Sequence, residues 1–351
     1  MKKFVPILKW KAGERSGLSN LNENVKETIT PIIEIVDDCS PEVVIKQLIN
    51  SLNKSVYFDT CKIEDYGKSL LESLITTATS QDINCIPILY PYDLEDHFER
   101  FSSFSDTVAI KIELPVDISS PPAPSIIRAI NALNDNSKNF DLIIDIGNVE
   151  NSREAARQYS EVCQTLLGSI DNLEIFNNII IASTSFPENI SSIASDSITE
   201  FERYDIQIFK KILFLEELEH LRGKLVYSDY GVTKYQDTEI DFSKMNSPII
   251  NKIRYTTDDK YILFKGKNKN LTNPIAVKFP ELSARLVRSK YYYGKNFSNG
   301  DLEIYNRSNG SLGPGNGTNW VATCINHHIT VVVEQLSKIY DSLDTFLCSS
   351  V

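Results

Sequence analysis

The sequence predicts an α/β fold, a (β/α)8 barrel of the TIM type with a C-terminal α+β subdomain, from three observations. Eight short apolar runs recur in the first 230 residues, helical segments separate them, and Ile, Val and Leu fill their interiors. Parallel strands that are buried on both faces have this composition, and eight β-then-α units in series are typical of a closed barrel. An open doubly wound sheet gives similar local patterns. However, no Walker loop and no G-x-G-x-x-G motif follows any of the runs, so we favour the barrel.

The expected strands follow one another at intervals that leave room for crossover helices. They are Phe4–Trp10, Pro31–Val36, Val56–Asp59, Ile86–Tyr90, Ala109–Glu113, Leu142–Asp145, Ile179–Ser183 and Leu225–Asp229.

The first expected helix is a short one at Glu23–Thr28, because the first strand runs into the glycine-containing segment 12–17, which predicts a loop. The second helix, Pro41–Leu52, has Ser40 as its N-cap and Pro41 at its first position. Further helices are expected at Gly67–Ala78 and Asp93–Phe101, within Ala123–Leu133 and Ser152–Leu167, and in the connection Ile190–Leu221.

Past Tyr230 the pattern changes, which predicts a barrel over residues 1–235 and a basic, aromatic subdomain over 245–351 that packs on it. Ile250–Tyr255 and Lys260–Phe264 read as an antiparallel pair of strands. The remaining expected elements are a helix at Phe279–Ser289, a strand at Leu302–Tyr305, a glycine-rich loop at Asn309–Asn319 and a closing helix at His327–Tyr340.

The composition, with 42% hydrophobic and 24% charged residues in a chain of 351, is that of an ordinary globular protein. No apolar run approaches the roughly 18 residues of a membrane span. Lys9 and Lys11 interrupt the start of the chain too early for a signal peptide, so we expect a cytoplasmic protein without a membrane partner. The six cysteines show no C-x-x-C spacing, which predicts reduced, structural thiols.

Charge is distributed unevenly along the chain. The stretch from Lys252 to Lys295 holds eleven cationic and three acidic side chains, a net +8, and the whole chain carries −11, which leaves −19 for everything else. Aromatic side chains interleave with the cations, as stacking on bases and neutralisation of phosphates require. A nucleotide or nucleic acid is therefore a candidate partner. The alternative is a basic face that packs against the acidic barrel.

Charged side chains end most of the predicted strands, where a barrel places its chemistry. Carboxylates gathered there would repel one another unless lysines or a divalent cation, Mg²⁺ or Mn²⁺, balanced them. The alternative is a set of salt bridges that closes the barrel mouth. Lys9 and Lys111 are candidate catalytic residues; a Schiff base on either one is a further alternative, although neighbouring carboxylates would raise the pKa of the amine. The candidate metal ligands are Glu34, Asp59, Glu113, Asp145 and Asp229.

The adjacent histidines His327 and His328 are the other candidate catalytic residues, as general acid or base or as a metal ligand. Adjacent residues on a helix do not share a face, so one of the two is expected to enter a site. The alternative is a helix turn with satisfied polar contacts. The glycine-rich loop either nests an anion or only turns tightly. The candidate substrate-binding residues are Lys11, Arg254, Lys265, Asn316 and Trp320.

Four stretches that occur in order along the chain together resemble the phage "beta protein" family, whose members occur in bacteriophages and bacterial genomes. They are Pro6–Glu14, Pro31–Ile35, Ile253–Asp259, and Gly315–Trp320 followed by Asn326-His327-His328. The resemblance spans Val5 to Leu336 and implies a role in phage biology or in the bacterial response to phage. Lys265 and Val321 depart from the family pattern, which often has Arg at both positions.

These observations predict a protein that acts on a phosphate-bearing substrate by metal-assisted phosphoester hydrolysis. In that scheme Lys9 and Arg254 hold the phosphate, and His327 or His328 protonates the leaving group. The alternative is a non-catalytic factor that binds a phage or host protein and uses the barrel as a scaffold.

Overall fold

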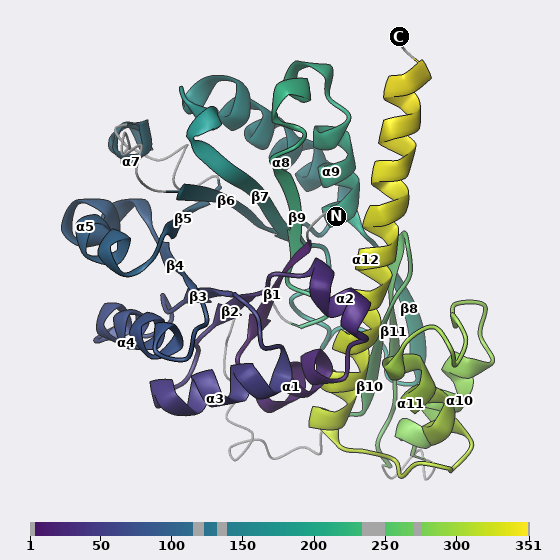
Figure 1. The fold of residues 1–351 in the computed structure, drawn as a ribbon. Helices are drawn as coiled ribbons and strands as arrows, with labels where there is room; N and C mark the ends of the chain where they lie inside the picture. Colours follow the sequence, from purple (N-terminus) through teal and green to yellow (C-terminus); the bar gives the residue numbers. More distant parts are fainter. Residues whose placement is uncertain (1–3, 115–122, 132–138, 234–249, 270–275, 350–351) are drawn as a thin grey trace.

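The computed structural model describes residues 4–114, 123–131, 139–233, 250–269 and 276–349. Eight parallel strands close into a barrel in the order β1-β2-β3-β4-β5-β6-β7-β9, and helices alternate with them on the outside (Figure 1). The closed ring confirms the predicted (β/α)8 barrel and excludes the open sheet. The barrel strands are β1 (Phe4–Lys9), β2 (Ile32–Glu34), β3 (Tyr57–Asp59), β4 (Ile86–Leu89), β5 (Thr107–Glu113), β6 (Asn139–Asn148), β7 (Phe176–Thr184) and β9 (Leu225–Asp229).

The helices around the barrel begin close to the positions that the sequence predicts. Ser40 caps the third of them by accepting a hydrogen bond from the Val43 amide, and Pro41 occupies its first position. The helices are α1 (Ala12–Ser19), α2 (Glu23–Thr28), α3 (Pro41–Ser51), α4 (Gly67–Thr79), α5 (Leu94–Phe104), α7 (Ala123–Asn131), α8 (Ser152–Gln164) and α9 (Tyr204–Leu213).

Two hydrophobic clusters reflect the alternation of side chains along the strands. A small cluster fills the barrel and includes Ile7, Ile32, Tyr57, Ala109 and Ile143. A larger one lies outside the strands, under the helices and the second sheet. Because side chains alternate with period two, membership of the inner cluster shows which strand residues point into the barrel.

The second sheet is antiparallel, in the order β10-β11-β8, with β10 at Lys252–Thr256 and β11 at Lys260–Lys265. Its third strand, β8 (Ser197–Glu202), comes from the connection between β7 and β9, in which the sequence predicted only helices. The subdomain therefore takes one strand from within the barrel segment of the chain. Its helices are α10 (Phe279–Val287), α11 (Asn299–Ser308) and α12 (Gly317–Ser349).

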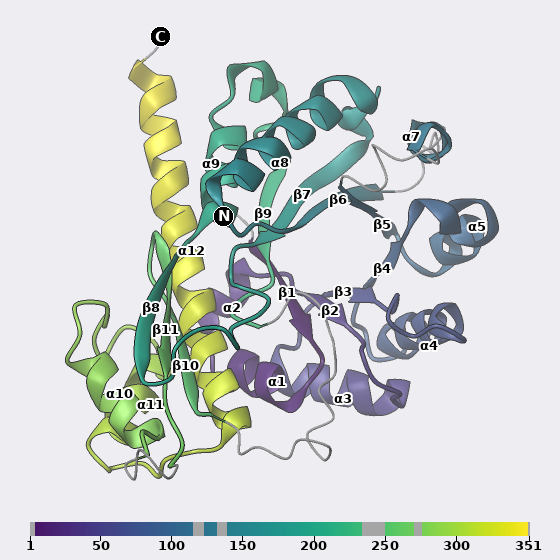
Figure 2. The ribbon, with the colours of Figure 1, turned by 180° about the vertical axis from the view of Figure 1, so that it is seen from behind.

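Helix α12 lies between the barrel and the second sheet in both ribbon views (Figures 1 and 2). It begins at Gly317, ten residues before the predicted start at His327. The segment Leu302–Tyr305, predicted to be a strand, lies inside α11, which Ser298 caps through the Asp301 amide. The segment 12–17, predicted to be a loop, forms most of α1. Gly13 and Gly17 lower the helix propensity there, but they also allow α1 to approach α12 closely.

Candidate functional site

Charged side chains form a layer at the C-terminal mouth of the barrel. Lys9, Glu34 and Asp59 are neighbours in the register of β1, β2 and β3, and all three share the inward face of the strands with Ile7, Ile32 and Tyr57. Lys111 of β5 and Asp145 of β6 also face inward, Lys111 in register with Ile143 and Asp145 in register with Glu113. The structure thus brings together five of the residues that the sequence singled out.

Lys111 is the centre of this layer. Its ammonium nitrogen lies 3.3 Å from Oδ2 of Asp59 and 3.3 Å from Oδ2 of Asp145. Tyr90 donates a hydrogen bond of 3.0 Å to Asp59, and Tyr230 donates one to Asp145. Both tyrosines follow directly after barrel strands and were not among the predicted site residues. The sequence did indicate that both tyrosines face inward, because each follows an inward-facing residue, Ile88 or Ser228, by two positions.

The pKa values in this cluster follow from burial and from Lys111. Burial raises the pKa of Glu34 to about 7, against the pull of Lys111 and with support from the negative charge of Asp59. Burial also opposes ionisation of Asp59, but Lys111 and the Cys61 amide outweigh it and lower the pKa of Asp59. Burial opposes the charge of Lys111 as well, yet the surrounding oxygens raise its pKa well above the ordinary value. The mouth therefore holds a charged Lys111 beside an ionised Asp59, and a Glu34 whose pKa lies near neutrality.

Of the remaining two candidate metal ligands, Glu113 faces inward beside the charged layer and Asp229 does not. Glu113 is the next inward position after Lys111 and is paired in register with Asp145. Asp229 points outward, because the inward positions of β9 are Val226 and Ser228. Within the described residues, no group of three or more His, Cys, Asp or Glu side chains has an arrangement that could hold a metal ion. The predicted five-carboxylate cluster is thus divided, with Asp229 on the far side of the barrel wall.

His327 and His328 are both fully buried inside α12, rather than at its beginning. His328 contacts Asp229 through Nε2 at 3.0 Å and Thr256 through Nδ1 at 2.9 Å. His327 contacts Asp301 through Nδ1 at 2.8 Å and the backbone oxygen of Thr256 through Nε2 at 2.8 Å. Both faces of the helix are covered here, so adjacent residues can both be buried. The geometry supports the alternative of satisfied polar contacts that join α12 to β9, β10 and α11.

Part of the basic segment forms ion pairs within the protein. Lys260 pairs with Glu200 and Glu202 of β8, and Lys267 and Arg285 both pair with Asp196, each at 2.7 Å. The aromatic side chains of β10 and β11 lie in the core, as does Phe279 of α10, so they do not form a stacking platform. Lys265, a candidate substrate-binding residue, is buried and donates hydrogen bonds to backbone oxygens that include Ile190 O at 2.9 Å. It anchors a loop.

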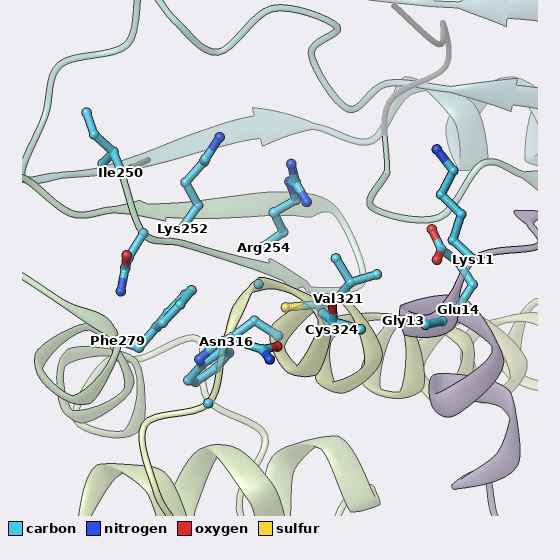
Figure 3. A pocket seen from close by; sticks show the side chains of 16 residues that line it. Lys11, Gly13, Glu14, Ile250, Lys252, Arg254, Phe279, Asn316, Val321 and Cys324 are labelled. Carbon is cyan, nitrogen blue, oxygen red and sulfur yellow. The ribbon is translucent and has the colours of Figure 1, made fainter. Parts of the chain in front are cut away.

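The other four candidate substrate-binding residues line one pocket of about 760 Å³, which we call the junction pocket because barrel and subdomain both contribute to it (Figure 3). Arg254 and Lys252 extend from β10, Lys11 and Glu14 come from the end of β1 and the start of α1, and Phe279 begins α10. Its lining residues are Lys11, Ala12, Gly13, Glu14, Ile250, Asn251, Lys252, Arg254, Phe279, Gly315, Asn316, Gly317, Thr318, Trp320, Val321 and Cys324.

Two helix N-termini meet in the junction pocket. Asn316 caps α12: its side chain accepts from the Asn319 amide at 3.0 Å, and Asn319 accepts from the Asn316 amide at 3.0 Å. Helix α1 can approach α12 this closely because Gly13 has no Cβ. A Cβ at this position would lie 2.7 Å from a side-chain carbon of Val321. In the described part of the chain, the amides of Gly317 and Thr318, and those of Ala12 and Gly13, have no acceptor. Such amides and the helix dipoles favour an anion.

Arg254 has no acidic hydrogen-bonding partner among the described residues. Its guanidinium lies 5.4 Å from the ring centroid of Phe186, and its Nε is buried without a hydrogen bond. Burial lowers its pKa, although Cys324 and Glu14 act in the opposite direction. Arg254 is half-buried, and a guanidinium with a buried, unpaired Nε favours an anionic partner.

Trp320 forms part of the pocket wall. Phe279 stacks on it with ring centroids 4.9 Å apart, and the Arg307 guanidinium lies 5.5 Å from its centroid. Its indole nitrogen donates to Pro314 O at 2.9 Å. Glu14, Lys252, Phe279 and the helix amides were missed by sequence reasoning, since segment 12–17 was interpreted as a loop and α12 was predicted to begin at His327.

Comparison with known proteins places the chain in a family. The structure contains, among its described residues, no helix that is long and apolar enough to cross a membrane. No curated protein matches the sequence. The family model described as Beta protein matches residues 4–334, which covers the barrel, the second sheet and the pocket-lining part of α12. The chain therefore belongs to the Beta protein family.

Proposed function

We propose that this protein acts on a phosphate-bearing substrate of nucleotide size, which it holds in the junction pocket. The observation that carries the proposal is the convergence of two helix N-termini with Arg254 in a pocket of about 760 Å³. That volume lies in the range of small-molecule sites. A phosphate group would receive hydrogen bonds from the Gly317 and Thr318 amides and from the guanidinium, which is the arrangement that recurs at phosphate sites.

The rest of the pocket suits the remainder of such a ligand. Ile250, Phe279 and Val321 form apolar walls, and Asn251 and Thr318 supply polar groups. An apolar pocket with a few convergent polar groups is the usual form of a cofactor or substrate site. Nucleic acid is a weaker candidate than a nucleotide, because ion pairs with Glu200 and Asp196 neutralise part of the basic segment and the aromatic side chains of β10 and β11 lie in the core.

Phosphoester hydrolysis remains the reaction that we propose for this ligand. Mg²⁺ or Mn²⁺ would enter with the substrate phosphates, because Mg²⁺ is commonly held by one or two carboxylates together with substrate oxygens rather than by a protein cage. The inward carboxylates Glu34 and Asp59 at the barrel mouth are neighbours of Lys9 in the register of the strands, and Lys9 precedes Lys11 of the pocket by two residues. The proposal gives no catalytic role to His327 or His328.

The first experiment is equilibrium binding of ATP, ADP and AMP to the full-length protein, followed by the fluorescence of Trp320 in a Trp10→Phe background. Trp10 and Trp320 are the two tryptophans of the chain, so this variant isolates the pocket signal. Arg254→Gln should weaken binding by roughly tenfold to a hundredfold, as expected for the loss of a charge-assisted hydrogen bond. The matched control is Arg285→Gln, which removes an arginine of the same subdomain that is paired with Asp196.

Phosphate release with and without Mg²⁺ then tests the reaction. Turnover that Arg254→Gln lowers and Arg285→Gln does not would support the proposal. Tight nucleotide binding without turnover would favour a non-catalytic factor. Absence of binding by the wild-type protein at millimolar nucleotide would refute the proposed function.

A further inference from the structure

Among the described residues that line the junction pocket, a single carboxyl group accompanies the cations. Glu14, in the first turn of α1, lines the pocket and is 5% exposed. In Figure 3 its carboxyl group lies beside the Lys11 side chain and faces the same space as Arg254. Among the described residues, its side chain has no hydrogen-bonding partner except its own backbone amide. An acidic group in the wall of a proposed anion site requires an explanation, because its ionised form would repel the ligand.

Three cations from β1, the start of α1 and β10 act electrostatically on Glu14. Lys9 belongs to β1, Lys11 precedes α1, and Arg254 belongs to β10. The titratable group that α12 contributes to the pocket is Cys324, whose pKa burial raises to about 11, so the thiol is neutral. Burial raises the pKa of Glu14, and this effect outweighs the three cations, which all lower it.

Binding of an anion changes that balance in one direction. The ligand neutralises the cations that favour the carboxylate, adds negative charge beside it, and removes water from the pocket. All three changes favour the neutral carboxyl form. The neutral form also supplies an O–H donor, whereas the ionised form offers only acceptors.

We propose that Glu14 is the specificity-determining residue of the junction pocket: in its neutral form it donates a hydrogen bond to an unprotonated oxygen of a bound tetrahedral oxyanion. The inference rests on the proposed function and identifies the recognised group as a phosphate-type dianion. Binding then requires a proton from solution, which resides on Glu14 in the complex. Between the pKa of Glu14 in the free protein and its pKa in the complex, up to one proton is taken up for each ligand bound.

Proton uptake on binding can be measured with inorganic sulfate as the ligand. Sulfate remains a dianion across the pH range of the experiment, so its own titration does not contribute to the measured uptake. In isothermal titration calorimetry, buffers of different ionisation enthalpy report the number of protons taken up on binding. For the wild-type protein we expect uptake and a sulfate affinity that falls as the pH rises. The fall approaches tenfold for each pH unit between the pKa of Glu14 in the free protein and that in the complex.

Glu14→Gln keeps the size of the side chain and a donor group, so the variant should bind sulfate without proton uptake and with an affinity independent of pH. The matched control is Glu281→Gln, an exposed carboxylate of α10 that is paired with Arg285; it should behave as the wild type does. A melting curve for each variant verifies folding, and the wild-type titration tests the inference without any variant.

The outcomes separate the two proposals. Sulfate binding by the wild-type protein with no proton uptake and no pH dependence would overturn the role of Glu14 and leave the anion site intact. Proton uptake that persists in Glu14→Gln would also overturn it, because another group would then carry the proton. Failure of the wild-type protein to bind either sulfate or phosphate at any pH would instead overturn the proposed function.

Discussion

Glu34→Gln should stabilise this protein above neutral pH. Glu34 is 3% exposed at the barrel mouth, and burial raises its pKa from 4.5 to about 7. The folded protein therefore binds a proton at this site more tightly than the unfolded chain does. Between the two pKa values the folded state holds more protons, so stability falls as the pH rises through this range, and the full penalty applies above pH 7.

The size of the effect follows from the same values. At 1.36 kcal/mol for each pKa unit, a rise from 4.5 to about 7 corresponds to about 3 kcal/mol at most. At roughly 2.1 cal/mol/K of unfolding entropy per residue, this corresponds to about 4 °C in Tm for a chain of this length. Lys111 retains Asp59 and Asp145 in the variant, each at 3.3 Å, so its charge stays compensated.

Urea unfolding curves at about pH 4 and at about pH 8 measure the difference directly. The variant and the wild type should be nearly equal at the lower pH, where Glu34 is protonated in both states, and the variant should be more stable at the higher pH. Glu95→Gln on the exposed face of α5 is the control and should change little at either pH. A Glu34→Gln variant that is less stable than the wild type at pH 8 would show that ionised Glu34 stabilises the mouth, and would refute the reasoning.

Three further predictions concern the packing around the two sites. Lys111→Met should lower the free energy of unfolding by about 3–5 kcal/mol at pH 8, because it leaves Asp59 and Asp145 without their cation. The loss of stability should be smaller near pH 5, and equal losses in denaturant titrations at both pH values would contradict this prediction. Gly13→Ala should lower stability by about 1–3 kcal/mol and weaken nucleotide binding, because its Cβ would meet Val321. Val321→Ala in the same chain should restore both, and no rescue in melting and binding assays would count against the close approach. Asp229→Ala should lower the free energy of unfolding by about 3 kcal/mol or more, because buried His328 loses its carboxylate partner. The nucleotide affinity of the folded protein should stay unchanged. A large change in Kd would contradict the assignment of Asp229 to the outer face.

The strands could be predicted because each is an apolar run of the right length, and their order follows from the chain. Which side of the wall a strand-end residue faces depends on the pleat, and this was misjudged at β9, where Tyr230 rather than Asp229 turns inward. Local pattern favoured a loop at segment 12–17, but packing on α12 selects a helix there. The helix in segment 12–17 depends on a tertiary contact with α12, and such a contact cannot be read from a single sequence.

The pocket was only partly predictable for a related reason. Arg254, Lys11, Asn316 and Trp320 were selected by residue type, and the fold does bring them together. Lys265 has the same chemistry but is used to hold backbone oxygens. The free backbone amides at the starts of two helices cannot be recognised from residue types. Their contribution to the pocket can be seen only once the positions of the helices are known.

Strand β8 has a consequence for how the molecule folds. It is contributed by the chain between β7 and β9, yet it pairs along its length with β11. A fragment that ended after β9 would retain β8 with no partner at an edge prone to association, and a fragment that began at β10 would lack a third of its sheet. Neither piece is a self-sufficient folding unit, so barrel and subdomain should unfold in one cooperative transition. The walls of the junction pocket are thereby held in register by topology as well as by packing.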